Sequence, residues 1–260
     1  MNFIKTTSAE KYSVSIITVC YNAVNTIERT ILSVINQNFS DFEYIIIDGK
    51  SKDGTLDIIN KYAEQINIIV SEEDLGIYDA MNKGVKLAHG EWVNFMNSGD
   101  VFASNDVILK IFSNKINSDI NFLYSDNFYL LANGEKFLSR NNHDEPCLLH
   151  QSSMYRKSLH NTFGYYIVSD PIIVSDYLFF CSLPKSYFLK VETIISINDT
   201  TGVSSIGDWC TEGSMCAKVV FRKWSMPKLF RKYMLHLLRV KMPLIFNYYY
   251  YLKKRLKISK

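Results

Sequence analysis

Hydrophobic residues in the first hundred positions form two alternating kinds of segment. Four short runs rich in Ile and Val are typical of buried parallel strands. They lie at 13–20, 44–47, 66–70 and 92–96. Between them, apolar residues recur at helical spacing in segments that begin near Asn25, Asp53 and Tyr78. The alternation predicts a Rossmann-like, doubly wound α/β fold, in which helices cover both faces of a mostly parallel sheet.

The pattern becomes less regular in the following hundred positions. It predicts a short helix at 107–112 and a strand at 121–129. A turn at Asn133-Gly134 then leads into a second strand at 136–139, as in a hairpin. Residues 145–205 mix short elements with polar loops, which suits a half of the domain that carries substrate-specific residues.

Charge is distributed unevenly along the 260 residues. Residues 218–260 hold 13 of the 29 Lys and Arg residues and no Asp or Glu, whereas residues 1–217 hold 16 basic and 26 acidic residues, a net charge of −10. The overall composition, 47% hydrophobic and 21% charged, excludes a disordered or collagen-like chain. We expect a single domain with halves at 1–105 and 106–217, followed by a basic tail.

Three features favour a reducing, cytosolic location for the body of the protein. The N-terminal segment lacks the basic and apolar regions of a signal peptide. Five cysteines without a C-x-x-C pair fit free, buried thiols and argue against a structural zinc site. The longest apolar stretch of the tail, at 242–252, is about half the length of a membrane-spanning helix. The sequence therefore predicts no transmembrane segment.

Three carboxylates follow predicted strands: Asp48, Asp74 and Asp100. Because the carboxyl ends of parallel strands meet at one edge of a sheet, we expect these acids at a shared ligand site. They would repel phosphates unless a divalent cation lay between, and carboxylate oxygens suit Mg²⁺ or Mn²⁺. Each acid taken alone also fits a helix cap or a turn. The glycine pattern of a dinucleotide site, G-x-G-x-x-G, does not occur in the sequence.

Two segments, 13–55 and 71–100, resemble the nucleotide-binding half of glycosyltransferase family 2. The first contains SVSIITVCYN and IDGKSKDGT, and the second contains SEEDLGIYDAMNKG and WVNFMNSGD. The similarity extends over about residues 13–105 and includes bacterial members that build capsule, exopolysaccharide or lipopolysaccharide, among them colanic-acid-type enzymes. It implies a GT-A fold and an inverting, metal-dependent transfer of a sugar from a nucleotide-sugar, here a UDP-sugar, to an acceptor.

The resemblance also implies roles for nucleotide-binding residues. Tyr21 would pack against the base, Asp48 would accept its imide N–H, and Lys83 would replace an arginine that many relatives carry at Met81. The implied nucleotide-binding residues are Val19, Tyr21, Asn22, Asp48, Asp74, Gly76, Asp79, Lys83, Ser98 and Gly99. Asp100 matches the last acid of the family's metal motif, which makes it the principal protein ligand of Mn²⁺ or Mg²⁺.

The second half of the chain resembles the family at shorter segments. Asp176 matches an acid that acts as the catalytic base on the acceptor hydroxyl. The residues implied on the acceptor and diphosphate side are His150, Gln151 and Arg156, in CLLHQSSMYRK, and Ser204, in a stretch like the loop that closes over the diphosphate. A hydrogen-bonded structural histidine is the alternative for His150.

The basic tail at 218–260 contains apolar residues at helical spacing between about 229 and 240, with Lys and Arg largely on other faces. A basic amphipathic helix fits an anionic membrane surface. This would hold the enzyme peripherally at the inner face of the cytoplasmic membrane, near a polyprenyl-linked glycan acceptor. The alternative is that the apolar face packs on the body or on a second subunit of a homodimer. No recognition motif for nucleic acid accompanies these charges.

These features predict an inverting glycosyltransferase, a hexosyl- or N-acetylhexosaminyltransferase of bacterial surface polysaccharide synthesis. The acceptor would be a glycan or a lipid-linked glycan. One alternative is a nucleotidyltransferase of similar fold, which generally needs a Gly-rich basic loop that does not follow Cys20. Another is a non-catalytic, membrane-associated scaffold, for which Asp176 would have no role.

Overall fold

The computed structural model describes most of the first 200 residues and a few positions beyond them. The described ranges are 3–6, 11–113, 115–131, 133–143, 148–168 and 174–200, with isolated positions at 227, 230, 231, 233–235 and 242. The chain divides into two compact units, Met1–Ile206 and Gly207–Lys260. Ser204 and almost all of the predicted basic tail lie outside the described residues, so the account below concerns the first unit.

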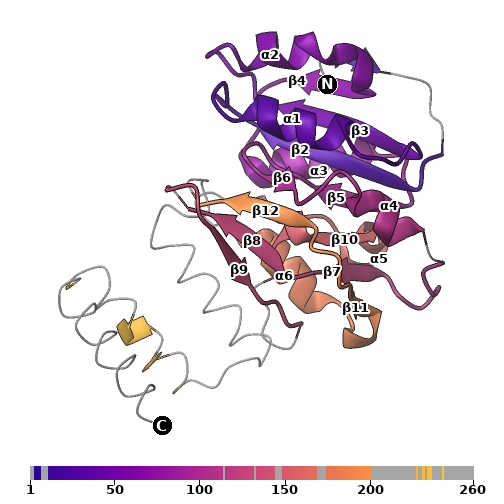
Figure 1. Cartoon of the computed structure of the whole chain (residues 1–260), viewed down its shortest axis with the longest axis vertical. Helices are drawn as coiled ribbons and strands as arrows, with labels where there is room; N and C mark the ends of the chain where they lie inside the picture. Colours follow the sequence, from indigo (N-terminus) through magenta and orange to yellow (C-terminus); the bar gives the residue numbers. More distant parts are fainter. Residues whose placement is uncertain are drawn as a thin grey trace. The chain divides into compact units, whose positions relative to one another are not determined.

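An eight-stranded sheet runs through this unit in the order β1-β4-β3-β2-β5-β10-β7-β11 (Figure 1). Its strands are β1 (Phe3–Thr6), β2 (Val14–Cys20), β3 (Phe42–Asp48), β4 (Ile68–Ser71), β5 (Trp92–Phe95), β7 (Phe122–Tyr124), β10 (Ser153–Arg156) and β11 (Phe188–Lys190). Strands β4, β3, β2 and β5 are parallel neighbours. They confirm the four strands predicted from the Ile- and Val-rich runs, with each end within two residues of its predicted position. Strands β1 and β10 are antiparallel to their neighbours β4 and β5.

A second, four-stranded sheet has the order β6-β12-β8-β9. Its strands are β6 (Val101–Phe102), β8 (Asn127–Leu130), β9 (Lys136–Ser139) and β12 (Ser196–Asp199). The predicted hairpin is confirmed, because β8 and β9 pair antiparallel and Gly134 has the positive φ of +84° that favours glycine.

The single strand predicted at 121–129 is wrong, because the chain leaves the large sheet at Ser125 and continues in the small one. The Ser125 N–H donates to the carbonyl of Ser152 (3.1 Å), and its Oγ accepts the N–H of Ile195 (2.9 Å). These contacts come from distant segments, so the apolar pattern on either side does not show the break.

Helices cover both faces of the large sheet, as predicted. They are α1 (Ile27–Ile35), α2 (Thr55–Lys61), α3 (Ile77–Leu87), α4 (Val107–Phe112), α5 (Leu159–Phe163) and α6 (Ser175–Ser182), with 3-10 turns η1 (Ala63–Gln65), η2 (His150–Ser152) and η3 (Lys185–Tyr187). Side chains of α1, α2 and α4 share a buried cluster with Ile16 and Ile46. Side chains of α3, α5 and α6 share the other cluster with Ile17 and Ile47. The side chains of successive strand residues thus point into opposite layers of the core, one on each face of the sheet.

Strand order reverses between β2 and β5. From β2 the chain moves outward through β3 to β4, and α3 then carries it back to β5 on the other side of β2. Such a reversal opens a crevice at the carboxyl ends of the strands, where open α/β sheets bind ligands. The loops that begin at Tyr21, Gly49 and Met96 all leave the sheet at this edge. Among the described residues, none of the helices has the length and apolar content that crossing a bilayer requires.

The opposite edge of the sheet is anchored by a buried carboxylate. Glu43 is 1% exposed and accepts hydrogen bonds from the Ser15 hydroxyl (2.5 Å) and from the N–H of Gly90 (3.0 Å). A Cβ on Gly90 would lie 2.4 Å from the backbone nitrogen of Ser15, so the turn before β5 approaches β2 as closely as backbone allows. This contact fixes the position of the turn that leads into β5.

A buried histidine in α5 is expected to make stability depend on pH. His160 is 2% exposed, and its ring nitrogens lie 2.9 Å from Tyr155 Oη and 3.0 Å from the Gly164 carbonyl oxygen. Burial lowers its pKa from 6.5 to about 4, so in this window the unfolded chain binds a proton that the folded protein does not. The contribution of neutral His160 to the free energy of unfolding is therefore complete above pH 6.5. It is lost as the pH falls from 6.5 to about 4, by about 3 kcal/mol in total.

The variant His160→Gln is expected to flatten this dependence, because an amide can accept and donate at the same two partners without titrating. In urea unfolding, the wild type should lose about 2 kcal/mol more than the variant between pH 7 and pH 5. His143→Gln, at a half-buried position, is the control for a change of histidine to glutamine elsewhere in the chain. Equal losses in the wild type and in His160→Gln would contradict the prediction.

Candidate functional site

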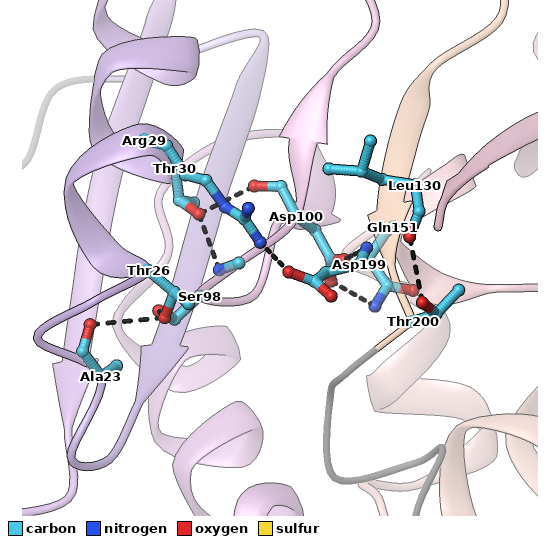
Figure 2. A network of polar contacts seen from close by, with 11 residues as sticks. Ala23, Thr26, Arg29, Thr30, Ser98, Asp100, Leu130, Gln151, Asp199 and Thr200 are labelled. Carbon is cyan, nitrogen blue, oxygen red and sulfur yellow. Dashed lines mark hydrogen bonds and ion pairs between the residues drawn. The ribbon is translucent and has the colours of Figure 1, made fainter. Parts of the chain in front are cut away.

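Helix α1 holds the backbone of the loop that follows β5 (Figure 2). The Thr30 hydroxyl accepts the N–H of Gly99 (2.9 Å) and donates to the carbonyl of Asp100 (2.8 Å). One turn earlier, Thr26 Oγ1 lies 3.0 Å from Ser98 Oγ. Gly99 has a φ of +103°, which side-chain-bearing residues rarely adopt. The predicted metal-binding loop therefore has a defined path set by two threonines.

The Asp100 carboxylate is buried and held at both oxygens. Oδ2 accepts from Nε2 of Gln151 (2.7 Å), and Oδ1 accepts the backbone N–H of Asp199 (2.8 Å). Burial raises the pKa of Asp100 to about 6, against the lowering effect of these two hydrogen bonds. These hydrogen bonds therefore do not fully offset the cost of burying the ionised carboxylate.

The surroundings of Asp100 fit a hard divalent cation. Oε1 of Gln151 belongs to the amide that binds Asp100, and it is buried without a hydrogen-bond partner. A carboxylate and an unpaired amide oxygen are ligand types that Mg²⁺ and Mn²⁺ accept. Within the described ranges, no group of three or more His, Cys, Asp and Glu side chains gathers as a ready-made metal site. The protein would thus supply only part of a coordination shell.

The predicted base, Asp176, lies at the start of α6 in a chain of hydrogen bonds. Its Oδ2 lies 2.8 Å from Nδ1 of His150, and its Oδ1 accepts the hydroxyl of Tyr78 (2.7 Å). Nε2 of His150 lies 2.8 Å from Nδ2 of Asn97, in the loop that leads to Asp100. Burial alone would raise the pKa of Asp176, but the hydrogen bonds and charge of His150, with Tyr78, keep it below its usual value. Asp176 is therefore ionised at neutral pH.

Asp48 ends β3 at the same edge and is fully buried. It accepts hydrogen bonds from the backbone N–H of Ser51 (3.0 Å), the Ser51 hydroxyl (2.5 Å) and the Ser71 hydroxyl (2.6 Å). The neighbouring loop is tied to it by Asn22, whose N–H donates to Ser51 Oγ and whose Oδ1 accepts the N–H of Lys52. Val19 reaches this edge through its backbone, because its side chain is buried and its carbonyl accepts the N–H of Ser98.

Tyr21 and Asp74 converge on Gly49. A Cβ on Gly49 would lie 2.6 Å from an Asp74 oxygen and 3.2 Å from the Tyr21 ring, so a larger residue there would require the Asp74 carboxylate to move. Tyr21 is 65% exposed, so its ring is accessible to a ligand. The Asp74 carboxylate has a raised pKa, chiefly because of burial, and accepts the N–H of Gly76. An aromatic face and an acid thus border the buried Asp48.

Lys83 is less available than the sequence predicts. Its ammonium lies 3.1 Å from Glu72, 3.2 Å from Asp79 and 2.8 Å from the carbonyl of Glu73. These two acids raise the pKa of Lys83 although burial opposes them. The charge of Lys83 is therefore neutralised within the protein. Its visible function is to tie α3 to the loop after β4.

Residues 15–114 match the family described as Glycosyl transferase family 2. That segment contains the buried Asp48, the exposed Tyr21 and the loop that ends in Asp100. The match confirms the resemblance to this family that the sequence predicts for about residues 13–105.

Relatives extend the match beyond the family segment. A PGL/p-HBAD biosynthesis glycosyltransferase of Mycobacterium tuberculosis is 31% identical over 168 residues, which cover 58% of this chain and 62% of the relative. An Escherichia coli enzyme named UDP-Glc:alpha-D-GlcNAc-diphosphoundecaprenol beta-1,3-glucosyltransferase WfgD is 30% identical over 125 residues, 48% of this chain and 49% of the relative. The chain therefore spans between about half and two thirds of these relatives.

Two solved structures have the same fold. Residues 1–349 of S. aureus TarS in complex with UDP match with a TM-score of 0.59 and 18% identity, covering 87% of this chain and 71% of TarS. The mannosyltransferase PcManGT of Pyrobaculum calidifontis, in complex with GDP-Man and Mn²⁺, matches with a TM-score of 0.56 and 12% identity, covering 92% and 74%. This chain has the GT-A fold.

Arg156 is not brought to the site of this glycosyltransferase fold. It ends β10 opposite Trp92, with its guanidinium carbon 4.7 Å from the centre of the Trp92 ring, and pairs with Glu91. Trp92 begins β5, whereas the loop to Asp100 follows the end of that strand. Arg156 therefore lies at the opposite end of β5 from the predicted metal ligand.

Sequence reasoning missed several residues that contact the site of this glycosyltransferase fold. They are Thr26, Arg29, Thr30, Tyr78, Asn97 and Asp199. A signal exists for the first three, which recur at helical spacing from the N-cap of α1 onward and place polar side chains beside one another. Asp199 has no local signal, because it lies 99 positions after the acid that it contacts.

Proposed function

We propose that this protein is an inverting glycosyltransferase, a hexosyl- or N-acetylhexosaminyltransferase that uses a nucleoside diphosphate-sugar. One observation carries the proposal: the consecutive residues His150 and Gln151 bind the two acids with opposite roles. Nδ1 of His150 lies 2.8 Å from Asp176, and Nε2 of Gln151 donates to Asp100 over 2.7 Å. A base and a diphosphate-side acid are thereby held by one short 3-10 turn. In-line displacement needs the base and the leaving-group side of the site to be held at a fixed separation.

Donor binding is assigned to the edge formed by β2, β3 and the loop after β4. Tyr21 offers an exposed aromatic face on which a base can stack. Asp48 is a buried acceptor beneath it. A hydrogen bond from a base N–H would replace one of the hydrogen bonds that Asp48 accepts from serine hydroxyls. A uracil base, with its imide N–H, suits this acceptor. The proposed donor is therefore a UDP-sugar.

Asp176 is the proposed general base. As the acceptor oxygen bonds to the anomeric carbon, its proton passes to Asp176, and the bond from that carbon to the diphosphate oxygen breaks with its electron pair. Tyr78 and His150 orient the carboxylate and keep it ionised. Attack on the face opposite the leaving group inverts the anomeric centre.

A divalent cation, Mn²⁺ or Mg²⁺, held by Asp100 and the Gln151 amide oxygen would stabilise the charge that develops on the leaving nucleoside diphosphate. The unpaired Gln151 oxygen supports this assignment. Further support is that the Pyrobaculum mannosyltransferase of the same fold is described in complex with Mn²⁺.

The proposed acceptor is a glycan or a polyprenyl-linked glycan of bacterial surface polysaccharide synthesis, such as capsule or lipopolysaccharide. The name of the Escherichia coli relative, which specifies a diphosphoundecaprenol-linked sugar, supports this class of acceptor. The proposed location is the inner face of the cytoplasmic membrane, with residues 218–260 on anionic lipid. Packing of these residues in a homodimer is the alternative, and nucleic acid is not a proposed partner.

A donor screen tests the proposed function. Purified protein is incubated with Mn²⁺ and single nucleotide-sugars, and slow hydrolysis of the donor is followed by release of the nucleoside diphosphate. We expect one UDP-sugar to be hydrolysed well above the others, and EDTA to abolish the reaction. Release of inorganic diphosphate from a nucleoside triphosphate and a sugar phosphate would instead indicate a nucleotidyltransferase. If the protein neither binds nor hydrolyses any donor, the result would support a non-catalytic scaffold.

A further inference from the structure

A second acid lies beside Asp100 at the end of a neighbouring strand. Strand β12 pairs antiparallel with β6, which starts directly after Asp100. As a result, Asp199 ends β12 at the same point, and its backbone N–H donates to Oδ1 of Asp100 over 2.8 Å. Figure 2 shows Asp100 and Asp199 next to each other, with Gln151 close to both. The Asp199 side chain is 14% exposed.

The carboxylate of Asp199 is paired with Arg29 of α1. Arg29 lies one turn from Thr26 and next to Thr30, the residues that hold the loop before Asp100, so the guanidinium reaches the site from a fixed helix face. The Arg29 side chain is 38% exposed, and its Nε is buried without an acceptor. Among the described residues, the hydrogen bond to Asp199 uses one of the five N–H groups of this guanidinium, which lies beside the two acids.

We propose that Asp199 is a second carboxylate ligand of the divalent cation, and that Arg29 is the counter-ion that the cation displaces from it. The inference deepens the proposed function, since it concerns the cation of the same site. Two carboxylates and the Gln151 amide oxygen form a set of hard ligands on one side of a cation. The remaining positions are left for waters and diphosphate oxygens.

Arg29 and the cation compete for the same carboxylate in this arrangement. A structural ion pair at these exposures would contribute little to stability, and breaking it would change cation affinity only through the field of one nearby charge. A counter-ion gives the opposite result: its removal takes away a positive charge that competes for the Asp199 carboxylate and tightens cation binding. The two partners of one ion pair are then expected to change cation affinity in opposite directions.

Binding of Mn²⁺ alone to the full-length protein tests this, with free Mn²⁺ measured by electron paramagnetic resonance. Asp199→Asn is expected to weaken Mn²⁺ binding about tenfold or more, because a charged ligand is lost. Arg29→Gln is expected to tighten it about threefold or more, since a competing charge is removed. Lys190→Gln is the matched control: it breaks the ion pair of Lys190 with Asp126 (2.6 Å, side chains 41% and 23% exposed). The control should bind Mn²⁺ like the wild type.

The outcomes separate this inference from the proposed function. Weaker Mn²⁺ binding by both Arg29→Gln and Asp199→Asn would overturn it, and so would an unchanged affinity in either. If the wild type binds Mn²⁺ too weakly to measure without nucleotide, the series is repeated at saturating UDP. The absence of Mn²⁺ binding at saturating UDP would also overturn the inference. Unfolding midpoints close to that of the wild type exclude loss of the fold. The readout needs no sugar transfer, so a failed donor screen would leave this result standing.

Discussion

Asp176→Asn is expected to lower kcat for sugar transfer by about 10²- to 10⁴-fold, the range for loss of a general base. The new amide can satisfy the existing partners, because its oxygen can accept from His150 while its NH₂ donates to the Tyr78 hydroxyl. The fold and the donor site should therefore persist. We expect the Kd for UDP, measured by calorimetry, to change less than about threefold, because the base acts on the acceptor and not on the nucleotide.

Tyr78→Phe is the matched control for this prediction. It removes the other hydrogen bond to Asp176 (2.7 Å) and leaves the carboxylate and His150 in place. The effect on kcat should stay within about tenfold, since the group that takes the proton is retained. A variant Asp176→Asn with near-normal kcat would show that another group is the base. Equal losses in both variants would show that the hydrogen-bond network matters rather than the proton acceptor.

Asp100→Asn is expected to abolish Mn²⁺-dependent transfer, with a loss of at least about 10²-fold in kcat/KM, because the principal charged ligand of the cation is removed. In contrast to Asp176→Asn, this variant should also lose most of the Mn²⁺-dependent part of UDP binding. Calorimetry with UDP in the presence of Mn²⁺ or of EDTA measures that part. Near-normal activity or an unchanged Mn²⁺ effect would contradict the assignment of Asp100.

The same variant is expected to be at least as stable as the wild type without cation. Burial raises the pKa of Asp100 to about 6, so its charge at pH 7 disfavours the folded state. A neutral amide removes that cost, which is at most about 3 kcal/mol. Rotation of the Gln151 amide lets its unpaired oxygen accept from the new NH₂ group. Urea unfolding in EDTA measures the difference, and a marked loss of stability would show that the carboxylate is structural.

The position of two acids at one edge of the sheet could be predicted from local sequence. Asp48 and Asp100 follow strand-like runs, and parallel strands end at the same edge, so no knowledge of distant contacts was required. The prediction was less accurate for Lys83, whose neutralisation by Glu72 and Asp79 depends on how α3 packs beside the preceding loop. The position of Arg156 was also missed, because β10 runs antiparallel to β5 and carries its last residue away from the site.

The amino-acid sequence by itself determined the parallel core, the order of its strands and helices, and the acids at the strand ends. It could do so because helix and strand periodicities are local and each buried run carries its own signal. Only the tertiary structure decided that Asp176 meets Tyr78 across 98 positions, and that Asp199 meets both Asp100 and Arg29. Such contacts join side chains from separate elements, and a single hydrogen bond between distant residues leaves no periodic trace in the chain.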